Sequence, residues 1–241
     1  MATAKKRRDL GFGDPAVFDR SPVVHPKSVF LDKAPFYAAM NISTLLGWLV
    51  LGVAAFLLRN WLPSQTWHYY IGIAAVFISM IAGSIIAIQS ASWKISGLAY
   101  LSLIAAPLGL LFGPLVLNVG VTNMVYALVG TAAWSVFMTL IGLAIKSDLQ
   151  RLGFDVVISV LLLVYVAASV VVLILWKPTP TWIITMASIG IVIFSLGLVY
   201  NANRSKFVPK TLDRAVDLGM QNFLETVNIA LRVMQILKSR S

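Results

Sequence analysis

The residues of this chain that could do chemistry lie on one face of a single stretch near residue 225. Six polar side chains recur there at steps of four, four, three, four and three: Asp217, Gln221, Glu225, Asn228, Arg232 and Gln235. This spacing predicts a helix over 216–237 with all six on one face. Carboxylates bind protons and cations, so the pattern points to a cation- or proton-responsive site centred on Glu225.

Lipid cannot satisfy such a face, because an ionised group at the bilayer centre costs roughly 2.5–3.5 kcal/mol. The polar face is therefore expected to look into a helix bundle or a watery cavity. Two roles for Glu225 stay open. It could pair with Asn228 and Arg232 in a network that fixes the helix in the bundle, although Arg232 lies about 10 Å away along the axis. Alternatively, Glu225 responds to cations or protons.

The rest of the chain has the composition of a polytopic membrane protein. Apolar residues make up 59% of the 241 residues, charged residues 12%, and the mean hydropathy is +0.87, which is far more apolar than a soluble domain. Each apolar stretch before the polar-faced one has about the 20 residues that a helix needs to cross the hydrocarbon. These stretches are 36–58, 67–89, 97–118, 123–145, 155–176 and 181–200.

The net charge of +10 is explained by topology rather than by a nucleic-acid partner. If the spans alternate, only Arg59 and Lys177 fall on one side. The other side then carries Lys5, Lys6, Arg7, Arg8, Arg20, Lys27, Lys33, Lys94, Lys146, Arg151, Arg204, Lys206, Lys210 and Arg214. This bias predicts a cytoplasmic N-terminus. A seventh full crossing leaves Lys238 and Arg240 outside, whereas a re-entrant helix would return them; we favour the full crossing.

The chain divides into a cytoplasmic arm over 1–35, a transmembrane domain over 36–237 and a short tail over 238–241. In the third span, Pro107, Gly113 and Pro114 interrupt the apolar run. They are expected to kink the helix, either as a structural bend or to open a cavity beside the polar face.

Catalysis is not expected. There is no cysteine, and the two histidines, His25 and His68, fall at different depths, so neither a triad nor a firm metal site can be assembled. We expect no cofactor.

Several fragments together resemble the Bax-inhibitor-motif transmembrane family. The fragments are Leu108-Gly109-Leu110-Leu111-Phe112-Gly113-Pro114, Gly130-Thr131-Ala132-Ala133, Lys146-Ser147-Asp148-Leu149 with Leu152-Gly153, Phe194-Ser195-Leu196-Gly197-Leu198-Val199-Tyr200-Asn201, and Phe223-Leu224-Glu225-Thr226-Val227-Asn228-Ile229. The resemblance covers roughly residues 36–237. It implies an all-α membrane protein in which six helices, paired as hairpins, surround a central seventh. Similarity to bacterial members places the chain in the inner membrane.

The resemblance also implies a proton-sensitive calcium leak, latched in other members by two aspartates that share a proton. The seventh-span aspartate falls on Glu225, but the sixth-span aspartate falls on Asn201. The pair is therefore broken, although Asn201 could hydrogen-bond Glu225 in either protonation state. Calcium needs six or more oxygen ligands, so any contact at Glu225 should be weak and transient.

A second function stays open beside the leak. Some bacterial members of the family bind a membrane-anchored ATP-dependent protease and modulate it. The arm over 1–35 could be the segment that such a partner binds. A scaffolding role in a membrane assembly is the remaining alternative.

Overall fold

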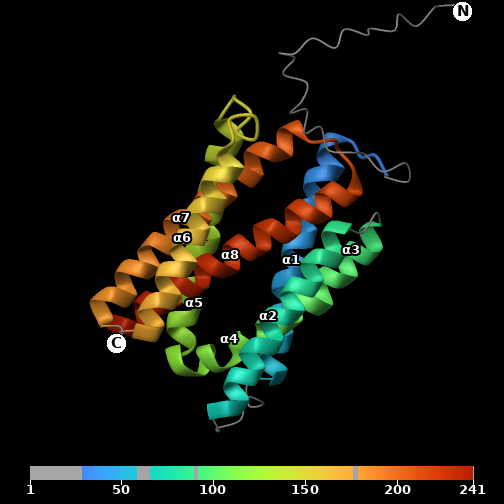
Figure 1. The fold of residues 1–241 in the computed structure, drawn as a ribbon. Coiled ribbons are helices and arrows are strands. Elements are labelled where there is room, and N and C mark those ends of the chain that lie inside the picture. The colour runs from blue at the N-terminus through green and yellow to red at the C-terminus, as the bar shows by residue number, and fades with distance from the viewer. Residues whose placement is uncertain (1–28, 59–65, 90–91, 176–178, 241) are drawn as a thin grey trace, which may run out of the picture.

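The computed structural model describes residues 29–58, 66–89, 92–175 and 179–240, and helices dominate throughout them (Figure 1). The helices are α1 Lys33–Leu58, α2 Thr66–Gln89, α3 Trp93–Ala99, the π-helix η2 Tyr100–Ala105, α4 Ala106–Val119, α5 Val121–Ala144, α6 Phe154–Leu175, α7 Pro180–Phe207 and α8 Leu212–Arg240. Because α3, η2 and α4 follow one another without a break, they form one rod. The described residues thus contain the seven rods that the sequence predicts.

The helix bounds agree with the predicted spans to within a few residues, apart from the end of α7. That helix continues seven residues past the predicted end at 200, to Phe207. Among the described residues, four helices are long and apolar enough to cross a membrane: Lys33–Leu57, Trp93–Leu110, Thr122–Ala144 and Pro180–Phe207. Shorter apolar helical segments cover Ala74–Ile86 and Phe154–Ser169. That all seven rods cross the bilayer stays a prediction.

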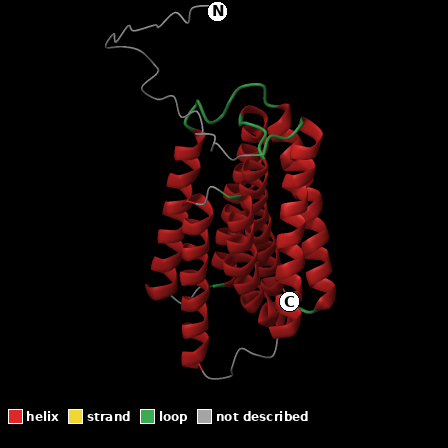
Figure 2. Cartoon of the chain, turned by 90° about the vertical axis from the view of Figure 1, so that its right-hand side faces the viewer, coloured by secondary structure: helices red, strands yellow, loops and turns green. Residues whose placement is uncertain are grey.

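The last helix, α8, runs between two groups of helices (Figure 1). It packs against α1, α3 and α4 on one side and against α5 and α7 on the other. The rods lie side by side along the bundle (Figure 2), and α8 ends at the end of the bundle opposite the start of α1 (Figure 1). The pairing of the other six helices into hairpins stays a prediction.

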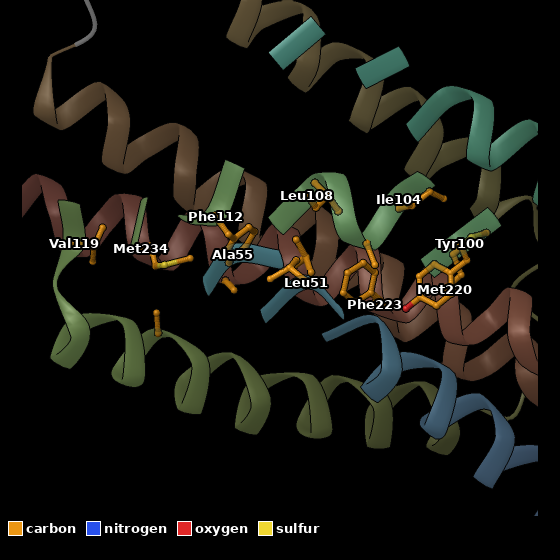
Figure 3. Packing of buried hydrophobic residues seen from close by; sticks show 14 residues of the cluster. Leu51, Ala55, Tyr100, Ile104, Leu108, Phe112, Val119, Met220, Phe223 and Met234 are labelled. Atoms are coloured by element: carbon orange, nitrogen blue, oxygen red, sulfur yellow. The ribbon is translucent and has the colours of Figure 1, made fainter. Parts of the chain in front are cut away.

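One apolar stripe of α8 forms the centre of the largest core cluster. Its members follow steps of three and four: Met220, Phe223, Val227, Ala230 and Met234, of which the last four are at most 1% exposed. They pack against Leu51 and Ala55 of α1, Tyr100 and Ile104 of η2, and Leu108 and Phe112 of α4 (Figure 3). Burial of this stripe positions α8, because a continuous strip of apolar and aromatic side chains packs closely only when it faces these three helices.

The segment before α1 is joined to the turn between α7 and α8. Phe30 and Thr211 form an antiparallel bridge. The Leu31 N–H donates to the Lys210 carbonyl at 2.8 Å, and the Leu212 N–H donates to the Val29 carbonyl at 2.9 Å. The remainder of the predicted arm, residues 1–28, lies outside the described residues, as do Arg59 and Lys177.

The interruption predicted in the third rod lies earlier than expected. The π-helical segment Tyr100–Ala105 ends two residues before Pro107, whereas the backbone stays α-helical through Gly113 and Pro114. Proline has no N–H, so Pro107 leaves the carbonyl of Leu103 without its helical donor. The hydroxyl of Ser79 in α2 donates to that carbonyl at 2.8 Å. A neighbouring helix therefore satisfies the group that proline frees, as a bilayer requires.

Replacing Ser79 with alanine is expected to lower the free energy of unfolding by about 1 kcal/mol, because the Leu103 carbonyl loses its donor. Unfolding of the detergent-purified protein by a denaturing detergent measures the change. Ser102→Ala is the matched control, since its exposed hydroxyl bonds only to the carbonyl of Leu98 one turn back. Equal losses in the two variants would show that the bond between α2 and the third rod contributes nothing.

Candidate functional site

The six polar residues of α8 lie on a different face from the apolar stripe. At 100° per residue, the polar face is rotated by roughly 130° from it. All six side chains are partly exposed, in contrast to the fully buried stripe. We refer to these six residues as the polar face of α8; they are Asp217, Gln221, Glu225, Asn228, Arg232 and Gln235.

Glu225 sits at the middle of the polar face, directly against α7. A Cβ built on Gly197 of α7 would collide with the Glu225 carboxylate. The absence of a side chain at Gly197 thus leaves the room in which that carboxylate lies, since an added Cβ would occupy it. Within the described residues, no hydrogen bond or ion pair to Glu225 is formed. The site is therefore a carboxylate packed on bare backbone, without a counter-charge in contact.

Asn201 is buried, with 4% of its surface exposed, and lies four residues beyond Gly197 in α7. This spacing places it about 6 Å further along the helix. The hydrogen bond to Glu225 that the sequence allows is not formed, and in the part of the chain that the structure describes neither side chain bonds to the other. Asn201 thus lies about one turn along α7 from Gly197, where the Glu225 carboxylate packs.

Arg232 is held away from Glu225 by other groups. Its Nη1 donates to Gln235 Oε1 at 2.9 Å, and its guanidinium carbon lies 5.3 Å from the centre of the Tyr165 ring in α6. Asn228 donates to the carbonyl of Leu224 in its own helix at 2.8 Å. The network of Glu225, Asn228 and Arg232 that the sequence leaves open is therefore not formed, because each side chain has a different partner or none.

Asp217 lies at the start of the polar face, where α8 meets α3. Ser96 of α3 donates to it at 3.3 Å, and Arg214 lies 3.5 Å from its other oxygen. One turn earlier, Asp213 accepts a hydrogen bond from the Trp93 N–H at 3.1 Å, which caps the first turn of α3. These two acids therefore join α8 to α3. Gln221 is partly exposed between Asp217 and Glu225.

No metal-binding cluster accompanies these acids. Among the described residues, no group of three or more His, Asp or Glu side chains converges. Any cation at Glu225 would have to complete its coordination with backbone carbonyls, amides or water.

The sequence reasoning missed Asn203, two residues after Asn201. Its Oδ1 accepts from the Leu149 N–H at 3.0 Å, and its Nδ2 donates to the carbonyls of Ile145 and Ser147, both at 3.0 Å. Asn203 is 0% exposed and so holds the α5–α6 loop onto α7. The Asn201-Ala202-Asn203 run does not show which asparagine faces the loop. Only the rotation of α7 decides that.

Two lysines at the same end also bind backbone carbonyls. Lys206 donates to the carbonyls of Leu143, at 3.0 Å, and Ile145 at the end of α5. Lys210 donates to the carbonyls of Ser205 and Val208, and its ammonium lies 4.8 Å from the Phe36 ring centre. Burial lowers the pKa of Lys210, and the charge of Lys33 lowers it further. Cations at helix C-termini are favourable, so these lysines also stabilise the turns that carry them.

The fold and this site define an all-α membrane protein with a polar helix in its interior. Residues 35–241 match the family model described as "Inhibitor of apoptosis-promoting Bax1". Since the match covers most of the chain, the protein belongs to the Bax inhibitor family, as its sequence fragments predict. Comparison with curated proteins finds no significant match.

Replacing Gly197 with alanine is expected to displace the Glu225 carboxylate and to destabilise the bundle by about 1–3 kcal/mol, because the added methyl overpacks the contact between α7 and α8. Gly130→Ala is the matched control, since a Cβ there meets nothing within 4 Å. Thermal unfolding in detergent measures both. A Gly197→Ala protein as stable as the control would contradict the close approach of Glu225 to α7.

Proposed function

We propose that this protein is a cation leak pathway, with calcium as the candidate ion, that follows the polar face of α8 and is controlled at Glu225. In this proposal the protein sits in the bacterial inner membrane with its N-terminus in the cytoplasm, and all seven rods cross the bilayer. Asp217 and Gln221 lie along the cytoplasmic half of the route, and Asn228, Arg232 and Gln235 along the other half.

One observation carries the proposal: a carboxylate lies deep in the bundle against Gly197, and no basic group of the described residues is in contact with it. Uncompensated charge is unfavourable in a low-dielectric interior. Such a carboxylate is stabilised when it takes up either a proton or a cation. Exchange between these two occupants would couple cation passage to pH.

The control differs from that of family members with two acids. Asn201 stands where the second aspartate would be, so no shared proton can hold the two helices together. An amide cannot take up a charge, so the response to pH rests on Glu225 alone. One carboxylate titrates in a single step, whereas a coupled pair titrates in two.

Glutamine at position 225 is expected to abolish the leak or to make it insensitive to pH, because the amide keeps the size of the side chain but exchanges no proton. Calcium flux into dye-loaded liposomes between about pH 5 and pH 8 measures this against wild type. A titrating Glu225 predicts a single-step pH profile for the wild-type protein.

Asp148→Asn is the control for loss of a carboxylate. Asp148 lies in the α5–α6 loop, 3.3 Å from Arg151 and away from the polar face, so its removal should leave the flux unchanged. A wild-type protein with no flux above that of empty liposomes at any pH would overturn the leak. Equal losses of flux in both variants would show that Glu225 does not control the leak.

A role as an interaction protein, for example as a modulator of a membrane-anchored ATP-dependent protease, is supported by a second observation. The segment that leads out of the N-terminal arm is joined to the α7–α8 turn by backbone hydrogen bonds at Leu31 and Leu212. A partner that pulls on the arm would therefore act directly on the two helices that carry Gly197 and Glu225. We propose this as the alternative to conduction.

Deletion of residues 1–27 separates these two functions. The leak should survive, because the deletion keeps the backbone hydrogen bonds of Val29 and Leu31. A complex that the partner forms by binding the arm should be lost. Liposome flux measures the first, and co-purification with the protease from the same membranes measures the second. Loss of flux with an intact complex would reverse the assignment.

A further inference from the structure

In the part of the chain that the structure describes, no carboxylate contacts the guanidinium of Arg232 in the second half of α8. The chain has nine acidic residues. Eight of them fall in the predicted arm, in the α5–α6 region or in the first turns of α8, and Glu225 is the ninth. The other eight are Asp9, Asp14, Asp19, Asp32, Asp148, Asp155, Asp213 and Asp217. Arg232 lies seven residues past Glu225, or about 10 Å along the helix. Glu225 is itself packed against Gly197 and does not reach it.

Two polar atoms in this region are buried without a hydrogen-bond partner among the described residues: Nε of Arg232 and the hydroxyl of Tyr165. Both converge over Gly190 of α7, where an added Cβ would lie 3.2 Å from Arg232 Nε and 2.7 Å from Tyr165 Oη. The Gln235 oxygen already accepts from Arg232 at 2.9 Å, which leaves the amide nitrogen of Gln235 as a further donor. Arg232 of α8 and Tyr165 of α6 thus bring two unpartnered donors together at Gly190, and Gln235 adjoins them through its bond to Arg232.

The depth of this cluster excludes a lipid headgroup as its natural occupant. Gly190 lies ten residues from Pro180, where α7 begins, or about 15 Å into the bundle. That is half of a hydrocarbon core about 30 Å thick. Arg232 as a residue is partly exposed on the polar face, so a ligand that enters along this face has to be small to reach the buried Nε.

We infer that Arg232, Tyr165 and Gln235 form a binding site for a small inorganic anion of the chloride type. A guanidinium inside the bundle without a counter-ion is unfavourable, and buried donors that lack acceptors, such as Arg232 Nε and the Tyr165 hydroxyl, are unfavourable as well. One bound anion would neutralise the guanidinium and accept hydrogen bonds from these donors. The inference concerns binding and does not depend on whether the protein conducts.

The test is thermal unfolding of the detergent-purified protein at constant ionic strength, with chloride replaced stepwise by gluconate. A ligand that binds only the folded state stabilises it, so chloride should raise Tm by about 2–4 °C. Arg232→Gln should lose the shift, and Tyr165→Phe, which keeps the ring but removes the hydroxyl, should reduce it. Arg151→Gln is the control, because Arg151 is 88% exposed in a loop and its loss should leave the shift intact.

Broadening of the chloride NMR signal by wild-type protein, and its loss in Arg232→Lys, measures binding without reference to stability. The lysine variant keeps the charge in case the glutamine variant does not fold, and it removes the Nε–H donor. Glu225→Gln should retain the chloride response even though it is expected to abolish the leak, so the two proposals can fail separately. Equal chloride responses in wild type and Arg232→Gln, or a response lost in Glu225→Gln, would overturn the anion site.

Discussion

The structure depends on one constraint: a polar helix surface in a bilayer must find its partners within the protein. α8 meets this constraint by dividing its circumference. The stripe from Met220 to Met234 packs on α1, η2 and α4, while the polar face, rotated away from it, meets α7, α3 and α6 at Glu225, Asp217 and Arg232. The apolar stripe fixes the rotation of α8, and that rotation decides which neighbour each polar side chain meets.

The same constraint governs the contacts around α8. Thr226 accepts a hydrogen bond from Trp48 of α1 at 3.0 Å, and the Gly219 carbonyl accepts one from Thr44 at 3.0 Å. Pro107 is tolerated because Ser79 takes over the carbonyl that it frees. Glu225 and Arg232 are the exceptions: neither is neutralised by an opposite charge. Within the described residues no ion pair reaches either of them, so these two charged side chains are where we expect function.

The sequence predicts the parts of this fold that depend on periodicity. The rod bounds follow from runs of apolar residues, and the interior position of α8 follows from the spacing of its polar residues. The contacts between rods could not be predicted, because they depend on how each helix is rotated. Asn203 rather than Asn201 holds the α5–α6 loop, and Tyr165 rather than Glu225 meets Arg232. The π-helical turn before Pro107 also escaped prediction, since Tyr100–Ala105 carries no glycine or proline to mark it.

The central place of α8 has a consequence for how the protein is made. A ribosome delivers the other six rods to the membrane before α8, so the two groups that α8 joins must exist for a time without the stripe that packs them. During that interval Leu51, Tyr100, Leu108 and the room beside Gly197 face lipid or one another. α8 therefore joins two groups of helices that are made before it. The backbone bonds of Val29 and Leu31 to the α7–α8 turn then fasten the first helix to the last.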